Sequence, residues 1–203
     1  LARCHGVVIS GVEAHVVEVE AHLSPGLPGM SIVGLPDTAV AESRDRVRAA
    51  VLTSGARWPQ QRITVGLSPA SLHKSGSGLD AAIASVVLAA DGQVPAEALC
   101  GVVLFAELAL DGRVRPVRGS VLAAVAAVRS GATRIVLAAE GADQAAIVPG
   151  IRALGARHFR SWIASMRGET DDGVFEAEAG SAAGDERRGR GNWSDAGGEQ
   201  RVG

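Results

Sequence analysis

A short loop of serine and glycine holds the residue types in this 203-residue chain that could do chemistry. It reads Lys-Ser-Gly-Ser-Gly at residues 74–78, after an apolar strand pattern at 62–67 and before a small-residue helix predicted at 80–90. Backbone N–H groups at the start of a helix attract anions, so the loop could hold a phosphate. Its serine hydroxyls could instead act as nucleophiles.

The order of residues in the loop argues against a nucleotide-binding P-loop. A P-loop requires Gly-x-x-x-x-Gly-Lys-Ser/Thr, in which the lysine and the hydroxyl follow the glycines. Here Lys74 and Ser75 precede Gly76, and Lys74 is the only lysine in the chain. We therefore do not expect the chain to bind nucleotide as P-loop proteins do.

Nucleophilic catalysis would require a base within hydrogen-bond reach of Ser75 or Ser77. Lys74 and His73 are the neighbouring bases, and Glu107 could orient one of them. Spacing alone assembles no catalytic triad, and a turn-shaping role for these serines and glycines is favoured. A residual serine hydrolase that uses Ser75 or Ser77 stays open as an alternative.

Hydrophobic periodicity and turn residues predict the elements that would position this loop. Strands are predicted at 7–9, 15–23, 30–33, 62–67, 101–110, 113–117, 134–138 and 151–154. Helices are predicted at 37–54, 80–90, 119–129, 141–147 and 161–167. Asp37 and Ser161 are the predicted N-caps, and Asp111-Gly112 predicts a two-residue hairpin turn. The first part of the chain is rich in strands, and strands and helices alternate in the later part. This order predicts a single domain of the α+β or α/β class.

Composition points to a soluble cytoplasmic protein with no membrane partner. Hydrophobic residues make up 47% of the chain and aromatic residues 3%, so the core must consist of aliphatic side chains. The longest apolar runs, such as 81–90, are too short to span a bilayer, and the first residues show no signal-peptide pattern. Cys4 and Cys100 match no metal-ligand spacing, so free thiols, a buried Cys100 and no metal site are expected.

The charges divide the chain into two parts. Residues 1–168 carry 16 basic and 13 acidic side chains, whereas residues 169–203 carry 4 and 9. The second part is rich in glycine and alanine and lacks periodicity, which predicts a disordered acidic tail after a domain at 1–168. In the helix predicted at 37–54, the alternating arginines Arg44, Arg46 and Arg48 are interpreted as a solvated surface in preference to a nucleic-acid contact.

Four separated blocks resemble the N-terminal domain of the ComM/YifB-type, magnesium-chelatase-like AAA+ proteins. They are Gly-Leu-Pro-Asp at 34–37, Ser-Arg-Asp-Arg-Val-Arg-Ala-Ala-Val at 43–51, Arg-Ile-Thr-Val-Gly-Leu-Ser-Pro-Ala at 62–70 and Gly-Arg-Val-Arg-Pro-Val-Arg-Gly at 112–119. The resemblance implies a ribosomal-S5-domain-2-like α+β fold that is related to the Lon protease domain. It also implies a bacterial hexameric ring ATPase that acts on branched DNA in recombination and natural transformation.

Members of this family continue into an AAA+ module with a Walker A loop, whereas this sequence ends in the acidic segment. The expectation is a truncated or frame-shifted product, an inert fragment, or a stand-alone domain. ATP and magnesium would then belong to the missing module, and no cofactor is expected in this chain.

Comparison with Lon-type proteases predicts that the chain is not a peptidase. Aligning residues 74–78 with the Lon loop Lys-Asp-Gly-Pro-Ser places Gly78 at the nucleophile, and aligning 116–121 with the second Lon motif places Val121 at the catalytic lysine. No catalytic residue is therefore assigned. The candidate DNA or anion contacts are Lys74, Ser75, Gly76, Ser77, Gly78, Arg113, Arg115 and Arg118, and a solvated loop surface is an equally favoured interpretation of the same residues.

Overall fold

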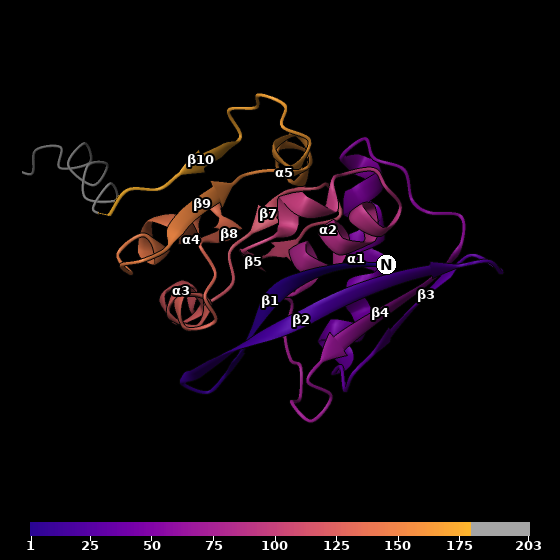
Figure 1. Cartoon of the computed structure of the whole chain (residues 1–203), viewed down its shortest axis with the longest axis horizontal. Coiled ribbons are helices and arrows are strands. Elements are labelled where there is room, and N and C mark those ends of the chain that lie inside the picture. The colour runs from indigo at the N-terminus through magenta and orange to yellow at the C-terminus, as the bar shows by residue number, and fades with distance from the viewer. Residues whose placement is uncertain (180–203) are drawn as a thin grey trace, which may run out of the picture.

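The computed structural model describes residues 1–179, which form one mixed eight-stranded sheet, a separate two-stranded ribbon and the helices that cover them (Figure 1). The strands of the large sheet are β1 (Ala2–Ser10), β2 (Glu13–Ser24), β3 (Gly29–Val33), β4 (Arg62–Ser68), β5 (Val102–Phe105), β8 (Arg134–Ala138), β9 (Arg152–Ala156) and β10 (Val174–Glu176). The ribbon pairs β6 (Glu107–Leu108) with β7 (Val114–Arg115). The helices are α1 (Thr38–Thr53), α2 (Asp80–Ala90), η1 (Ala96–Leu99), α3 (Ser120–Arg129), α4 (Ala139–Ala145) and α5 (Phe159–Met166).

The strand order β10-β9-β8-β5-β1-β2-β4-β3 divides the sheet into two halves that meet at β1 (Figure 1). In one half, β1, β2 and β4 are antiparallel, and β3 adds parallel to β4 at the edge. In the other half, β1, β5, β8 and β9 are parallel, and β10 adds antiparallel to β9. The mixed sheet and its helices confirm the coarser expectation of a single domain that combines α-helices and β-strands.

Helices cover both faces of the parallel half of the sheet. The side chains of β5 point alternately to these two faces, which explains why every residue of β5 is apolar. Val102 and Leu104 pack in the cluster that includes α1, α2 and α5, whereas Val103 and Phe105 pack in the cluster that includes α3. A strand that is buried on both faces cannot alternate between apolar and polar residues. Helix α2 lies against this sheet with all residues from Asp80 to Leu88 buried.

Several helix and turn boundaries differ from the prediction, including those of α4, which spans Ala139–Ala145 where 141–147 was expected. The last helix begins at Phe159 with His158 as its N-cap, and Ser161, the predicted N-cap, is a buried residue inside the helix. The predicted two-residue hairpin turn is longer. Ala109 N donates to Arg113 O at 2.9 Å, and Gly112 takes the positive φ of +82° that closes the turn.

The expectation of a disordered tail from residue 169 onward is wrong for residues 169–179. Phe175 pairs with Gly155 in the sheet, and Arg152 binds Glu176 at 2.6 Å. A strand of three residues is too short to show an alternating pattern, so β10 could not be predicted from hydrophobic periodicity. The remainder of the predicted tail, 180–203, lies outside the described residues. No helix within residues 1–179 combines the length and apolarity that a membrane crossing requires.

Candidate functional site

The Gly-Leu-Pro-Asp block fixes the serine-glycine loop in place. Pro36 forms a parallel bridge with Lys74, where Lys74 N donates to Leu35 O at 3.2 Å and Asp37 N donates to Lys74 O at 2.9 Å. The Asp37 side chain caps α1 by accepting from Val40 N at 2.8 Å, and its second oxygen accepts from Gly76 N at 3.3 Å. One aspartate therefore both starts α1 and holds the loop that precedes α2.

Lys74 does not present its ammonium group at the surface, contrary to its assignment as a phosphate contact. The residue has no exposed area, and its Nζ donates to the backbone carbonyl of Pro69. Burial lowers the pKa of Lys74, because removal from water disfavours the charged form. The backbone of Lys74 is paired with Pro36 and its ammonium group is bonded to Pro69 O, so this side chain is not available to a phosphate at the surface.

The loop serines do not form a nucleophile–base pair with the neighbouring lysine or histidine. The Ser77 hydroxyl donates to the carboxylate of Glu107, and His73 is exposed. Within residues 1–179, no hydrogen bond joins Ser75 or Ser77 to Lys74 or His73. The structure thus brings Ser77 to Glu107, which had been considered only as an orienting group.

Gly78, the residue aligned with the Lon nucleophile, lies where a side chain does not fit. A Cβ built on Gly78 would be 2.6 Å from Cε2 of Phe105, closer than real Cβ contacts. Phe105 is itself buried, in the core cluster that contains residues of α3 and β8. Glycine is required here because the chain passes directly over an aromatic ring.

A buried ion pair joins the loop region to α1. Asp80, the first residue of α2, has no exposed side-chain area, and Arg46 Nε donates to its Oδ2 at 2.7 Å. Arg46 Nη2 donates to Oδ1 at 3.1 Å, and Ser43 Oγ donates to the same oxygen at 2.5 Å. Leu108 N adds a fourth hydrogen bond at 3.2 Å. The carboxylate is therefore fully bonded and connects α1, α2 and β6.

The surroundings of this pair shift both pKa values. Burial raises the pKa of Asp80, while the hydrogen bonds from Arg46 and Ser43 oppose that shift. The hydrogen bond to Asp80 raises the pKa of Arg46, so the guanidinium stays charged. A buried carboxylate needs such partners because an unpaired charge in the interior is costly.

This ion pair was not predicted from the sequence, where Arg46 was interpreted as part of a solvated helix surface. That interpretation is wrong for Arg46, because its side chain is only 22% exposed and points to Asp80. A signal was present in the sequence: Asp80 is the one charged residue in a helix pattern that is otherwise apolar or small. Arg44 and Arg48 do lie at the surface, as expected.

The arginines of the β6–β7 hairpin and of the segment that follows it are exposed, and β6 contacts the loop through the Ser77–Glu107 hydrogen bond. Arg115 pairs with Glu107 in the β6–β7 register, and both line a cavity of about 330 Å³ together with Arg46. Arg113 Nε binds Asp111 at 2.7 Å on the exposed turn. Arg118 is also exposed. The structure thus places the three arginines on one connected hairpin segment, with Lys74 apart from them in the interior.

No metal centre is visible in the described part of the chain. Within residues 1–179, no three His, Cys, Asp or Glu side chains gather into a set that could hold an ion. Both cysteines are free thiols. Cys4 is buried with its Sγ donating to Ala82 O at 3.3 Å, and burial raises the pKa of this thiol. The expectation of a buried Cys100 is wrong, because this residue is exposed after the end of η1.

Several known proteins are similar in sequence to this chain over most of its length. The family model described as subunit ChlI of Mg-chelatase matches residues 19–141. An uncharacterized Mycobacterium tuberculosis protein is 46% identical over 170 residues, which cover 84% of this chain and 34% of the relative. The Escherichia coli protein YifB is 40% identical over 83% of this chain and 33% of its own length. Competence protein ComM of Haemophilus influenzae is 42% identical over 73% of this chain and 29% of its own.

These matches confirm the family resemblance read from the four sequence blocks. The chain spans about a third of the length of the curated relatives it matches. The matched residues 19–141 include the loop, the Arg46–Asp80 pair and the arginine hairpin. The chain therefore belongs to the magnesium-chelatase-like family of the ChlI subunit, with YifB and ComM among its relatives.

Proposed function

We propose that this chain is a non-catalytic, Lon-like domain of ribosomal-S5-domain-2-like fold through which a ComM/YifB-type AAA+ ATPase assembles and contacts DNA. The whole machine would act in DNA recombination and natural transformation, and ATP and magnesium would be bound by its AAA+ module. Family membership supports this assignment, as does the similarity to a relative named competence protein ComM.

The packing and hydrogen bonding of the serine-glycine loop are the observation that supports a non-catalytic role. Gly78 leaves no space for a nucleophile beside Phe105, and Lys74 is buried on a backbone carbonyl. Asp80 is committed to four hydrogen bonds, with Arg46, Ser43 and Leu108 as donors. Lys74, Ser77 and Asp80 thus each have a structural partner, which suits a scaffold that holds α1, α2 and the hairpin together.

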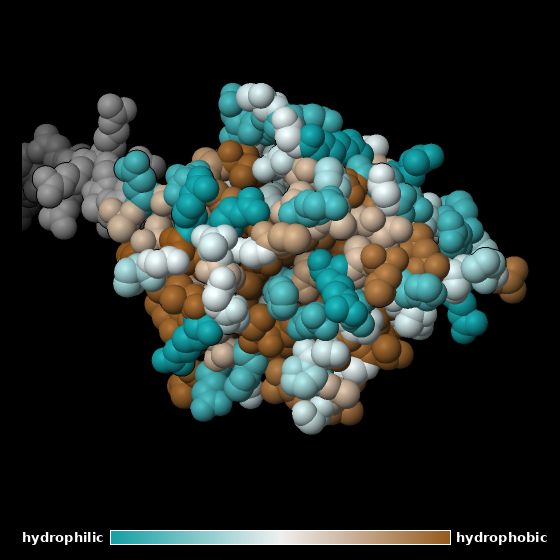
Figure 2. Space-filling view, viewed as in Figure 1, coloured by the Kyte–Doolittle hydropathy of each residue, from teal (hydrophilic) through white to brown (hydrophobic). Residues whose placement is uncertain are grey.

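The surface that we propose for DNA is the arginine hairpin, formed by Arg113, Arg115 and Arg118. All three residues are exposed, so their guanidinium groups can reach phosphates. Figure 2 shows that hydrophilic and hydrophobic residues intermingle over the viewed face, without one face-wide hydrophilic region. Affinity for DNA must then come from a local cluster of arginines, since residues 1–168 are close to neutral.

Fluorescence anisotropy of the full chain with labelled four-way-junction and duplex DNA tests this function. Binding is expected to weaken steeply with salt, because phosphate contacts release counterions. Mass photometry of the same samples tests assembly, for which we expect a ring-sized oligomer. Absence of salt-sensitive binding, even by an oligomer, would contradict DNA contact.

A further inference from the structure

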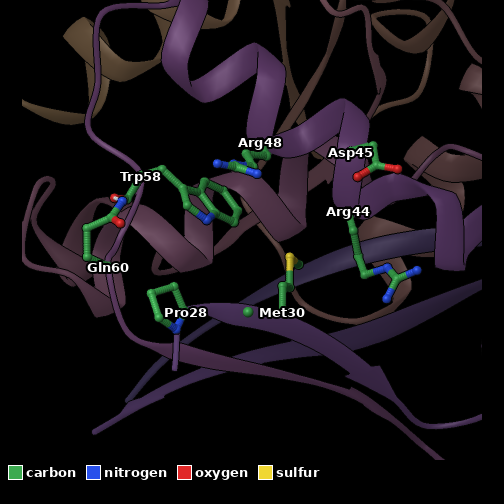
Figure 3. Close-up of a pocket in the computed structure, with 8 residues that line it drawn as sticks. Pro28, Met30, Arg44, Asp45, Arg48, Trp58 and Gln60 are labelled. Atoms are coloured by element: carbon green, nitrogen blue, oxygen red, sulfur yellow. Dashed lines mark hydrogen bonds between the residues drawn. The ribbon is translucent and has the colours of Figure 1, made fainter. Parts of the chain in front are cut away.

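A second surface with binding chemistry lies on the far side of α1 from the buried ion pair. It is a cleft of about 390 Å³ between α1, the start of β3 and the segment that leads into β4 (Figure 3). Pro28 and Met30 form its apolar wall, and Trp58 faces them. Arg44 and Arg48 border it from α1. Volumes of this size accommodate small organic groups such as a nucleotide.

Trp58 is held in a fixed position at this cleft. On its N-terminal side, Gln93 bonds both backbone groups of Arg57, with Arg57 N to Oε1 at 2.9 Å and Nε2 to Arg57 O at 2.7 Å. On its other side, Pro59 is buried and Gln60 Nε2 donates to Trp58 O at 3.0 Å. The indole itself is half-buried and packs in part on the main core. A ring that is already ordered loses little entropy when a ligand stacks on it.

The two arginines at the cleft are available to an anion. Arg44 and Arg48 are four residues apart on α1, so they lie on the same helical face, and both are exposed. Neither forms an ion pair with another residue of 1–179, and Arg44 Nε bonds only the carbonyl of Ala41. Asp45 is the single acidic residue that lines the cleft. Figure 3 shows the Arg48 guanidinium extending toward the indole of Trp58.

We propose that this cleft binds an unpaired nucleotide of single-stranded nucleic acid. The base would stack on Trp58 against the wall of Pro28 and Met30, and Arg44 and Arg48 would contact its flanking phosphates. Aromatic rings beside positive charge are the way proteins hold single strands without reading their sequence. Two arginines one turn apart offer two phosphate contacts, which suits a strand better than a lone monophosphate. This site uses other elements than the arginine hairpin and does not depend on the hairpin contacting DNA.

Anisotropy with two labelled strands of equal length tests the proposal: a dT12 oligonucleotide and a fully abasic analogue that keeps the phosphates. Trp58→Ala should weaken dT12 binding about tenfold, within the range of one stacked base, and leave the abasic strand unchanged. Trp58→Phe should retain most of the dT12 affinity. The double variant Arg44→Gln/Arg48→Gln should bind both strands more weakly. The slope of its log affinity against log salt concentration should fall by roughly the contribution of two phosphate contacts.

The control variant combines Arg129→Gln and Arg160→Gln, which remove two exposed arginines from α3 and α5, and it should bind as the unmodified protein does. Thermal melts of every variant exclude loss of fold as the cause. The proposal is overturned if dT12 does not bind, or if Trp58→Ala changes the affinities for dT12 and the abasic strand equally or changes neither. It is also overturned if free dTMP, at the same total nucleotide concentration, displaces labelled dT12 as well as unlabelled dT12 does. A loss of junction binding on removal of Arg113, Arg115 and Arg118, with dT12 binding intact, would leave this inference standing by itself.

Discussion

Arg46 and Asp80, 34 residues apart in the chain, form a two-pronged ion pair in which the carboxylate is entirely buried, with Nε–Oδ2 at 2.7 Å and Nη2–Oδ1 at 3.1 Å. The pair joins the middle of α1 to the first residue of α2, directly after the serine-glycine loop. The ion pair therefore connects α1 and α2 beside the serine-glycine loop.

Removal of the guanidinium should destabilise the domain strongly. Arg46→Met leaves the Asp80 carboxylate buried without its charged partner, and we expect a loss of about 3–5 kcal/mol in the free energy of unfolding. Denaturant titration followed by circular dichroism measures the change. Arg44→Met, two residues away on the exposed side of the same helix, is the matched control and should change stability by less than about 0.5 kcal/mol. Equal effects of the two variants would contradict a structural role for Arg46.

The cost of Arg46→Met should depend on pH. Burial raises the pKa of Asp80 above its unfolded value, so the contribution of this group to stability is full below the unfolded pKa and falls as pH rises through the folded pKa. Without the opposing hydrogen bond from Arg46, the folded pKa rises further and that fall becomes larger. The destabilisation by Arg46→Met should therefore be greater at pH 7.5 than at pH 4.5. A difference that does not change with pH would show that Asp80 is not the group responsible.

Introducing a serine at Gly78, the residue that the sequence alignment places opposite the Lon nucleophile, should harm the fold and create no hydrolase. Gly78→Ser places a Cβ 2.6 Å from the Phe105 ring, and overpacking of this kind costs about 1–3 kcal/mol. Gly66→Ser is the matched control, because the nearest atom to a Cβ there is 3.9 Å away. A fluorophosphonate serine probe should label neither the unmodified protein nor Gly78→Ser. Labelling that disappears in Ser77→Ala would instead establish the alternative of a residual serine hydrolase.

The two thiols should differ in reactivity. Cys4 is buried, and the resulting rise in its pKa keeps it protonated at pH 8, whereas Cys100 is exposed. Iodoacetamide should add one label to the native protein, none to native Cys100→Ser, and two to the unfolded protein. Mass spectrometry of the intact chain counts the labels. Rapid labelling of Cys4 in the native state would contradict the packing of β1 against α2.

The parts of the fold that could be predicted from the sequence are those that depend on residues close together in the chain. Asp37 caps α1 as expected, because an N-cap acts on the backbone three residues away. The apolar and small residues of α2 likewise identified a buried helix at 80–90. Strand β10 and the early start of α5 were missed, because pairing with β9 and burial of Phe159 and Trp162 depend on distant parts of the chain.

The same distinction explains the errors at the candidate site. Lys74 was expected at the surface because lysine usually is, and its burial follows from a bridge to Pro36 that no local pattern indicates. The partner of Arg46 lies on another helix, so its role was visible only in the assembled fold. In contrast, the exposure of Arg113, Arg115 and Arg118 could be anticipated from a short hairpin, and the structure agrees.

The most direct test of a DNA-contacting role compares two triple variants in junction-DNA anisotropy at low and moderate salt. One variant changes Arg113, Arg115 and Arg118 to Gln, and the other changes Arg62, Arg129 and Arg160, three exposed arginines away from the hairpin, to Gln. Both remove the same charge, so they separate a local contact from net electrostatic attraction. If the hairpin contacts DNA, the hairpin variant alone should lose affinity about tenfold and show a shallower salt dependence. Equal affinities for the two variants, or a greater loss for the control, would contradict this contact.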